Sequence, residues 1–264
     1  MMDKYLIVTD LDGTLLNSKH NISDFNIQQI NQFRKYNGQF TIATGRTNKS
    51  VEPYIKKLNI RLPIITYNGG QIYCPVKKQV LYHRTLPITE ELCEYLKAAV
   101  TFSEVVFIAE EQIYTINRGD VCRDFERKEN LTTIEVNWNE LPKQVTKIML
   151  MSKARKDLEN FSTTLTDKFK TLTLVFSQME YLEILPVATS KGEALKELIN
   201  LCQLTDAYTI GFGDNFNDIP LLTASDLGIA VSNAEPQLKK VADHTSQYTN
   251  DQDAVGHYIQ GLLK

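Results

Sequence analysis

The chain has 264 residues, of which 42% are hydrophobic; this content excludes a disordered protein and is enough to bury a full core. Its net charge of −3 at pH 7 is spread along the chain without a basic stripe, which argues against nucleic acid and anionic membranes as partners. We therefore expect a protein that acts on a small molecule; composition leaves its oligomeric state open.

The amino-terminal residues and the cysteines favour a cytoplasmic protein. The chain enters its first predicted strand soon after Met1, without the apolar region of a signal peptide, and no window approaches the length of a membrane span. The cysteines are too widely spaced for a metal or redox motif, so we expect four free thiols: Cys74, Cys93, Cys122 and Cys202.

The first predicted strand, residues 5–9, ends at two carboxylates one residue apart, Asp10 and Asp12. Open parallel sheets bind ligands beyond the carboxyl ends of their strands, so both acids would face one crevice. Neighbouring carboxylates repel each other, and a divalent cation such as Mg²⁺, which prefers oxygen ligands, is the usual compensation. A carboxylate can also act as a nucleophile. Taken alone, the same residues are also consistent with a loop that has a solvated acidic tip.

Strands and amphipathic helices alternate in the next part of the chain, which predicts parallel βαβ units. Ser23 is a suitable cap for the first helix, and Gly38 is placed to end it. A second strand, residues 40–43, ends at Thr44 and Gly45, whose hydroxyl and backbone N–H groups suit an anion.

The pattern changes between about residues 84 and 185, where paired short strands replace the alternation. The predicted hairpins are 105–109 with 113–117 and 172–176 with 181–185, and the predicted helices are 89–100 and 155–169. We expect an inserted antiparallel sheet with helices on one face. Pro87 and Pro186 lie near its two junctions, where stiff connections could form a paired hinge.

The alternating pattern resumes after this insertion. Ser190 and Glu193 have the spacing of a capping box at the start of a helix, and Lys191 lies in its first turn. A cation there opposes the helix dipole unless an anion is bound. A further strand, residues 208–212, leads into a segment rich in oxygen ligands, residues 213–218.

Four motifs, in this order along the chain, resemble those of the haloacid dehalogenase superfamily, and within it the Cof-type hydrolases with a large α/β cap of type IIB. They are Asp-x-Asp-Gly-Thr at 10–14, Thr-Gly-Arg at 44–46, Lys-Gly at 191–192 and Gly-Asp-x-x-Asn-Asp at 213–218. One departure is Ala254, where such proteins usually have glycine, and we expect only a local change in a turn.

The resemblance implies an α/β fold with two domains. The core would be a Rossmann-like, doubly wound parallel sheet built from residues 1–83 and 186–264. Residues 84–185 would form an inserted α+β cap domain. The implied activity is Mg²⁺-dependent hydrolysis of phosphate monoesters of small metabolites, such as sugar phosphates, by a phosphatase that forms an aspartyl-phosphate.

The resemblance also assigns roles to individual residues. Asp10 would attack the phosphorus, and Asp12 would protonate the leaving alcohol and later take a proton from water. The implied Mg²⁺ ligands are Asp10, the backbone carbonyl of Asp12, Asp214 and Asn215. The implied phosphate-binding groups are the N–H groups of Leu11 and Gly45 and the side chains of Thr44, Lys191 and Asn217.

Other residues keep two interpretations. Asn68 either supports the site or is an ordinary turn residue, and Asp218 either orients Lys191 or is a plain acid at a helix start. Arg46 is expected at the surface or facing the cap, and no chemistry is assigned to the histidines, His20 included.

Two alternative functions stay open at this point. A phosphomutase or phosphotransferase would pass the phosphoryl group to a sugar hydroxyl instead of water. A sensor would bind a phosphorylated ligand without turnover. The substrate itself is not predicted, because specificity would depend on cap side chains.

Overall fold

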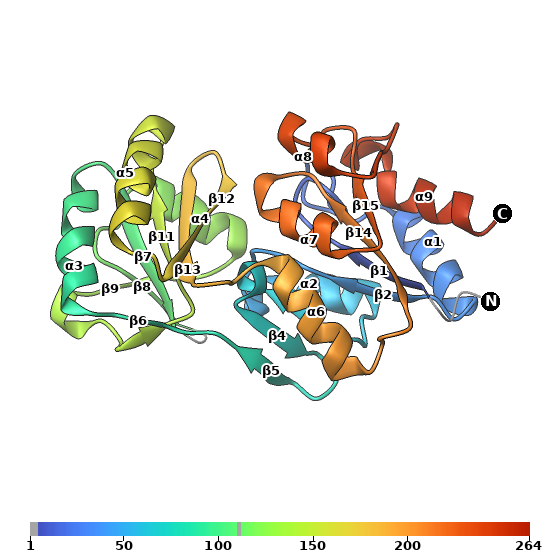
Figure 1. Cartoon of the computed structure of the whole chain (residues 1–264), viewed down its shortest axis with the longest axis horizontal. Helices are drawn as coiled ribbons and strands as arrows, with labels where there is room; N and C mark the ends of the chain where they lie inside the picture. The colour runs from blue at the N-terminus through green and yellow to red at the C-terminus, as the bar shows by residue number, and fades with distance from the viewer. Residues whose placement is uncertain (1–4, 110–111) are drawn as a thin grey trace. The chain divides into compact units, whose positions relative to one another are not determined.

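The computed structural model describes residues 5–109 and 112–264 and divides the chain into two compact units (Figure 1). The first unit contains residues up to 45, residues 51–82 and residues 190–264. The second unit contains residues 46–50 and 83–189.

Segments 5–83 and 190–264 contain the described residues of the first unit, together with residues 46–50 and 83 of the second. Their strands are β1 (Tyr5–Thr9), β2 (Gln39–Ile42), β3 (Ile64–Thr66), β4 (Gln71–Cys74), β5 (Gln79–His83), β14 (Tyr208–Gly213), β15 (Leu227–Ala230) and β16 (His244–Thr245). Their α-helices are α1 (Asp24–Lys35), α2 (Asn48–Leu58), α6 (Lys191–Cys202), α7 (Ile219–Ala224), α8 (Pro236–Val241) and α9 (Ala254–Leu262). Short 3₁₀ helices are η1 (Tyr67–Gly69), η4 (Phe216–Asp218) and η5 (Asn250–Gln252).

A five-stranded parallel sheet organises the first unit, in the order β16-β15-β14-β1-β2. Successive side chains of a strand point to opposite faces. Ile7 of β1 therefore packs in the apolar core formed with α1, α2 and α9, and its neighbours Leu6 and Val8 pack with α6, α7 and α8. All three side chains are fully buried, as expected for a sheet covered on both faces. The doubly wound core predicted from the sequence is confirmed.

This topology brings the carboxyl ends of β1, β2 and β14 to one edge of the sheet, because the three strands are parallel and β1 lies between the other two. A parallel bridge between Ala43 and Ile65 continues the edge to β3, which forms a further sheet with β4 and β5. Segments that are far apart in the sequence therefore meet at this edge.

Helix α1 begins as predicted and ends by a different device. The Ser23 hydroxyl accepts a hydrogen bond from the N–H of Asn26 at 3.0 Å, which confirms the predicted cap. The residue with positive φ after the helix is Asn37, at 66°, and not Gly38. Gly38 is required for space, because a Cβ atom there would lie 2.4 Å from the ring of Phe33.

The second unit is an antiparallel sheet with helices. Its strands are β6 (Leu86–Pro87), β7 (Glu104–Ala109), β8 (Gln112–Thr115), β9 (Ile134–Glu135), β10 (Gln144–Val145), β11 (Lys147–Met151), β12 (Leu172–Gln178) and β13 (Tyr181–Pro186). Its helices are α3 (Glu90–Lys97), α4 (Asp120–Glu129) and α5 (Arg155–Lys168), with 3₁₀ helices η2 (Ala98–Thr101) and η3 (Trp138–Glu140). The main sheet has the order β12-β13-β11-β7-β8-β9, and its first four pairings are antiparallel, whereas β9 runs parallel to β8.

The two helices predicted for this insertion lie on one face of the sheet as expected, but a third helix, which was not predicted, lies on the other face. Helices α3 and α5 share an apolar core with Leu182 and Ile184 of β13. Helix α4 lies on the opposite face, where its Phe125 ring is 6.1 Å from the ring of Tyr181, the neighbour of Leu182. The sequence of α4 carries few apolar residues, although Val121, Cys122 and Phe125 lie on one face, and no helix was predicted there.

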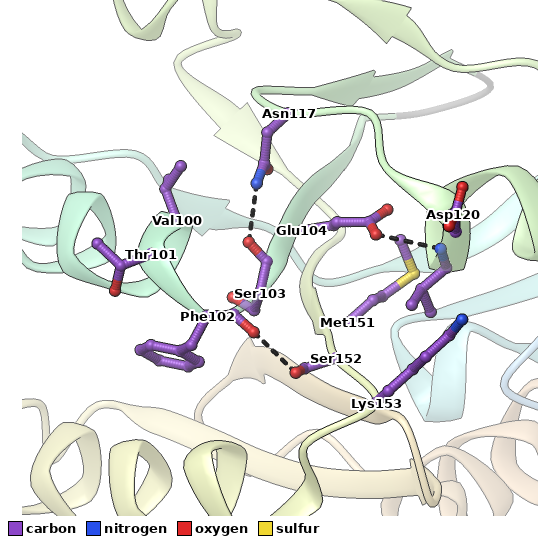
Figure 2. A pocket seen from close by; sticks show the side chains of 11 residues that line it. Val100, Thr101, Phe102, Ser103, Glu104, Asn117, Asp120, Met151, Ser152 and Lys153 are labelled. Carbon is purple, nitrogen blue, oxygen red and sulfur yellow. Dashed lines mark hydrogen bonds between the residues drawn. The ribbon is translucent and has the colours of Figure 1, made fainter.

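An open depression of about 380 Å³ lies beside the start of β7 and the end of β11 (Figure 2). The Glu104 carboxylate accepts hydrogen bonds from three backbone N–H groups at the start of α4. Asn117 donates to the Ser103 carbonyl at 2.8 Å, and Ser152 donates to the Phe102 carbonyl at 2.7 Å. These side chains tie together the ends of strands and helices, which gives them a structural role. Across the ranges described here, no helix combines the length and the apolar content needed to cross a membrane.

Candidate active site

The site lies within the first unit, at the edge where β1, β2 and β14 end. Lys191, the first residue of α6, is fully buried there. Its Nζ is 2.6 Å from Oδ1 of Asp10 and 2.6 Å from Oδ1 of Asp218. A buried ammonium group needs such partners, because burial without them would be costly. Lys191 therefore joins the residue after β1 to the segment after β14.

Asp218 has both carboxylate oxygens engaged. Oδ1 accepts the hydrogen bond from Lys191, and Oδ2 accepts from the backbone N–H groups of Asp214 and Asn215 at 2.9 and 3.1 Å. The carboxylate therefore orients the lysine and closes the turn after β14 at the same time. This arrangement agrees with the interpretation of Asp218 as a partner of Lys191.

Asp214 faces the loop that follows β1. Its Oδ1 accepts a hydrogen bond from the Thr14 hydroxyl at 2.8 Å. Gly13 has a φ of 78°, in the left-handed region that favours glycine, and a Cβ atom there would lie 2.4 Å from Oδ2 of Asp214. Gly13 is therefore required both for its backbone angle and for the space that Asp214 occupies.

Three carboxylates gather around the one lysine. A single oxygen from each of Asp10, Asp214 and Asp218 lies within 4.8 Å of the other two. Burial raises the pKa of Asp10 to about 7, although Lys191 opposes that shift. Burial, followed by the charges of Asp218 and Asp10, holds the pKa of Asp214 well above its ordinary value. Burial alone would lower the pKa of Lys191, but the charges of Asp10 and Asp218 outweigh it and raise that pKa.

The cluster fits a divalent cation. With all four groups ionised, three carboxylates face one lysine, which leaves an excess of two negative charges. The donors are hard oxygen atoms, which Mg²⁺ and similar ions prefer. Asp218 is the poorest candidate for a ligand, because both its oxygens already accept hydrogen bonds. Asp10 and Asp214 are the carboxylates best placed to bind an ion.

The segments after β2 and β3 form the other side of the site. The Thr44 carbonyl accepts a hydrogen bond from the N–H of Asn68, and the Asn68 side chain accepts one from Nδ2 of Asn217, both at 3.0 Å. A Cβ atom on Gly45 would lie 3.0 Å from Nδ2 of Asn68. Asn68 is 1% exposed and has a φ of 54°, which asparagine tolerates better than most residues. The structure thus brings Thr44, Gly45, Asn68 and Asn217 together.

The segment 11–12 places its two candidate residues differently. Leu11 is fully buried, and its carbonyl accepts hydrogen bonds from the N–H groups of three following residues, which makes the turn compact. The Asp12 side chain is 25% exposed, and its Oδ1 lies 3.3 Å from Nδ1 of His20. Sequence reasoning assigned no chemistry to His20, because the histidine lies outside every motif. Only the folded loop brings it to Asp12.

Arg46 directly follows Gly45 but belongs with the second unit. The side chain is buried, donates to the Ser50 hydroxyl at 2.9 Å and lies 3.3 Å from Glu129 of α4. Ser50 also donates to Glu129. Arg46 is therefore not a surface residue, and its pairing with Glu129 within the second unit agrees with the other expectation, that it faces the cap.

Comparison with known proteins identifies the family to which the chain belongs. A profile of the haloacid dehalogenase-like hydrolases matches residues 7–259. Phosphatase YwpJ of Bacillus subtilis is 28% identical over 287 residues, which cover 98% of this chain and 99% of YwpJ. The 5-amino-6-(5-phospho-D-ribitylamino)uracil phosphatase YitU of the same organism is 22% identical, and the match covers 97% of this chain and 96% of YitU.

A solved structure has the same fold. A haloacid dehalogenase-like hydrolase from Bacteroides thetaiotaomicron superposes with a TM-score of 0.84 at 26% identity, covering 98% of this chain and 99% of that chain. The profile match extends over nearly the whole sequence and therefore includes both units. The chain belongs to the haloacid dehalogenase-like hydrolase family, and it is a phosphatase of that family.

Proposed function

We propose that the protein hydrolyses phosphate monoesters of small metabolites in a Mg²⁺-dependent reaction that passes through an aspartyl-phosphate on Asp10. The observation that carries this proposal is the placement of Asp10. Its carboxylate follows β1 directly, 2.6 Å from the buried Lys191 and within a cluster of oxygen ligands. A nucleophile there has both a cation to orient it and groups that can bind an anion.

The first step transfers the phosphoryl group to the protein. An oxygen of Asp10 forms a bond to phosphorus while the bond from phosphorus to the ester oxygen breaks. Asp12 gives its proton to that oxygen, and the substrate leaves as an alcohol. Dividing the displacement in this way makes the leaving of the alcohol and the entry of water separate events.

The second step restores the protein. Water attacks the phosphorus of the aspartyl-phosphate, Asp12 takes a proton from that water, and the bond from phosphorus to Asp10 breaks. Inorganic phosphate leaves with Asp10 as a carboxylate and Asp12 protonated again. Asp12 therefore alternates between acid and base while Asp10 remains the nucleophile, and no other side chain gains or loses a proton.

The transferring phosphoryl group needs donors around its equatorial oxygens, where its charge is spread. Lys191 supplies a positive charge, and burial strengthens its effect because little water screens it. Four other groups complete the proposed set: the N–H groups of Leu11 and Gly45, the Thr44 hydroxyl and the Asn217 side chain. Asn68 supports this set through its hydrogen bonds to Thr44 and Asn217.

Asp10, Asp214 and the Asp12 carbonyl would hold Mg²⁺, which reduces repulsion between the nucleophile and the phosphate when bound. Asn215 would complete the shell, directly or through water. Its Oδ1 already accepts a hydrogen bond from the N–H of Phe216 at 2.7 Å, which favours the contact through water. Thr14 fixes Asp214 by its hydrogen bond and so prepares the ligand set.

The substrate class we propose is a small phosphorylated metabolite with an alcohol leaving group, such as a sugar phosphate. The name of YitU supports this class, because the compound it denotes carries its phosphate on a ribityl chain. The net charge of the protein gives no reason to expect a polyanionic macromolecule as substrate.

The test is phosphate release from a panel of phosphorylated sugars, sugar alcohols, nucleotides and cofactors, with Mg²⁺ and with a chelator. Asp10→Asn, which keeps the shape but removes the nucleophile, is the control. Release that requires both Mg²⁺ and Asp10 supports the proposal. A rate unaffected by removing Mg²⁺ would contradict it, and transfer to an added alcohol in preference to water would favour a phosphotransferase. Tight binding without release would favour a sensor.

A further inference from the structure

We propose that His20 is a positioning residue for Asp12, with an Nδ1–H group that holds one carboxyl oxygen of Asp12 so that the other is directed to the leaving group. This inference rests on the proposed function, in which Asp12 is the acid and base. It starts from one contact: Nδ1 of His20 lies 3.3 Å from Oδ1 of Asp12.

Stability alone does not account for this contact. The side chains of His20 and Asp12 are 49% and 25% exposed, and a pair exposed to that degree contributes little to folding. A partly exposed carboxylate can also rotate about its Cβ–Cγ bond. A contact at one of its oxygens restricts that rotation, and the direction of the second oxygen is then set as well.

The loop that carries His20 has a specific local structure. The Asn17 side chain accepts hydrogen bonds from the N–H groups of Lys19 and Asn21, both at 3.0 Å. The N–H of His20 donates to the Asn17 carbonyl at 2.8 Å. His20 itself has a φ of 54°, an uncommon backbone angle for a residue with a side chain. These hydrogen bonds fix the backbone position from which the imidazole ring of His20 extends.

The same loop is fastened to the rest of the first unit at several points. The Ser18 N–H donates to Asp251 at 2.7 Å, and the Asn250 side chain donates to the Leu16 carbonyl at 2.9 Å. The Tyr54 hydroxyl donates to the carbonyl of His20 at 3.3 Å. The imidazole is therefore presented to Asp12 from an anchored backbone. That anchoring is what a positioning residue requires.

Three substitutions separate the ring from the loop. His20→Gly accepts the positive φ and removes the side chain. His20→Asn also tolerates this φ, and its amide nitrogen can occupy the place of Nδ1, because both atoms are bonded to Cγ. His20→Gln carries the same amide one carbon further out, nearer the place of Nε2. We expect His20→Asn to position Asp12 as the histidine does, and we expect His20→Gly and His20→Gln not to do so.

The informative measurement is kcat/KM, which reports the step in which the leaving group departs. An alkyl phosphate needs its leaving oxygen protonated, whereas p-nitrophenyl phosphate has a good leaving group and needs little help from an acid. General acid catalysis typically raises the rate ~10²–10⁴-fold, and a poorly oriented acid loses part of this enhancement. For Gly and Gln we expect kcat/KM to fall ~10-fold or more with the alkyl substrate and less than ~3-fold with the aryl substrate. Asn should stay within ~3-fold of the wild type on both.

Two further measurements distinguish the loss of Asp12 positioning from a general loss of structure. The Mg²⁺ affinity should be unchanged in all three variants, and the melting temperature should be unchanged in His20→Gly and His20→Asn, which tolerate the positive φ. Equal losses on the two substrates, equal activity of Gly and wild type, or equal behaviour of Asn and Gln would each overturn the inference. A wild type without phosphate release, or an active Asp10→Asn, would instead overturn the proposed function, and the inference would fall with it.

Discussion

Lys191→Met tests the account of the buried cluster most directly. Lys191 makes two contacts of 2.6 Å, with Asp10 and Asp218. At an effective dielectric constant of about 20, each such pair is worth about 6 kcal/mol of attraction. The substitution also removes the cost of burying the ammonium group, and Asp10 can take up a proton in the variant, so that together these effects offset most of the two attractions. We therefore expect the free energy of unfolding to fall by ~3–5 kcal/mol at pH 8 without metal.

The loss should depend on pH in a defined direction. The pKa of Asp10 is about 7 in the folded protein, above its ordinary value of 3.8. An acid with a raised pKa in the folded state costs stability progressively as pH rises from 3.8 through the folded value. Removing Lys191 raises that pKa further, so the cost continues to grow above pH 7. One unit of additional shift makes the loss ~1 kcal/mol larger at pH 8 than at pH 5.5.

The assay is urea unfolding in metal-free buffer at pH 5.5 and pH 8. Lys196→Met is the matched control, because Lys196 lies in the same helix with a side chain that is 61% exposed. We expect the control to change stability by less than ~0.5 kcal/mol at both values. If Lys191→Met is no less stable than this control, or if its loss is the same at both pH values, the electrostatic argument is wrong. Should the variant be unfolded at pH 8, the comparison at pH 5.5 still measures the loss.

Three further outcomes follow from the site and the second unit. Gly13→Ala should weaken Mg²⁺ binding at least ~10-fold, because the new Cβ would displace Asp214; unchanged calorimetric affinity would contradict this. Mg²⁺ affinity should rise ~10-fold or more between pH 5 and pH 6, because Asp10, and Asp214 where it is protonated, must lose a proton to bind; a constant affinity would contradict this. Lys147→Met should cost ~3–5 kcal/mol, because it leaves the buried Glu183 carboxylate, now 2.8 Å from the lysine, without its cation; unchanged urea unfolding would contradict this.

The positions of the main strands could be predicted from the sequence, because the order of apolar runs and amphipathic helices is a local property of the chain. The rule that parallel strands place their carboxyl ends at one edge then brings Asp10 near Thr44 and Asp214 without further information. The structure has these three residues at the ends of β1, β2 and β14. No comparable rule applied to α4, where only three side chains pack as apolar groups.

The hydrogen-bond partners of the site residues were harder to predict from the sequence. Thr14 contacts Asp214 across 200 residues, and Asn217 contacts Asn68 across 149 residues. Each contact depends on loop conformations that residue types alone do not determine. The contact of His20 with Asp12 spans only eight positions in the sequence but was not predicted either. Its approach depends on a turn held by Asn17 and on a positive φ, which no motif indicates.

The charge imbalance of the cluster indicates that its three carboxylates serve a function and not the stability of the fold. A core selected only for folding would not retain three carboxylates around one lysine, because burial raises the free energy of every ionised acid that lacks a partner. Asp218 is compensated by Lys191 and two backbone N–H groups. Asp10 shares Lys191 with it, and Asp214 accepts a hydrogen bond from the uncharged Thr14 hydroxyl. The two acids with raised pKa values are therefore the ones whose cost a bound cation would remove. The same two follow β1 and β14, the adjacent strands at the centre of the sheet, where a phosphate and its metal can be held together.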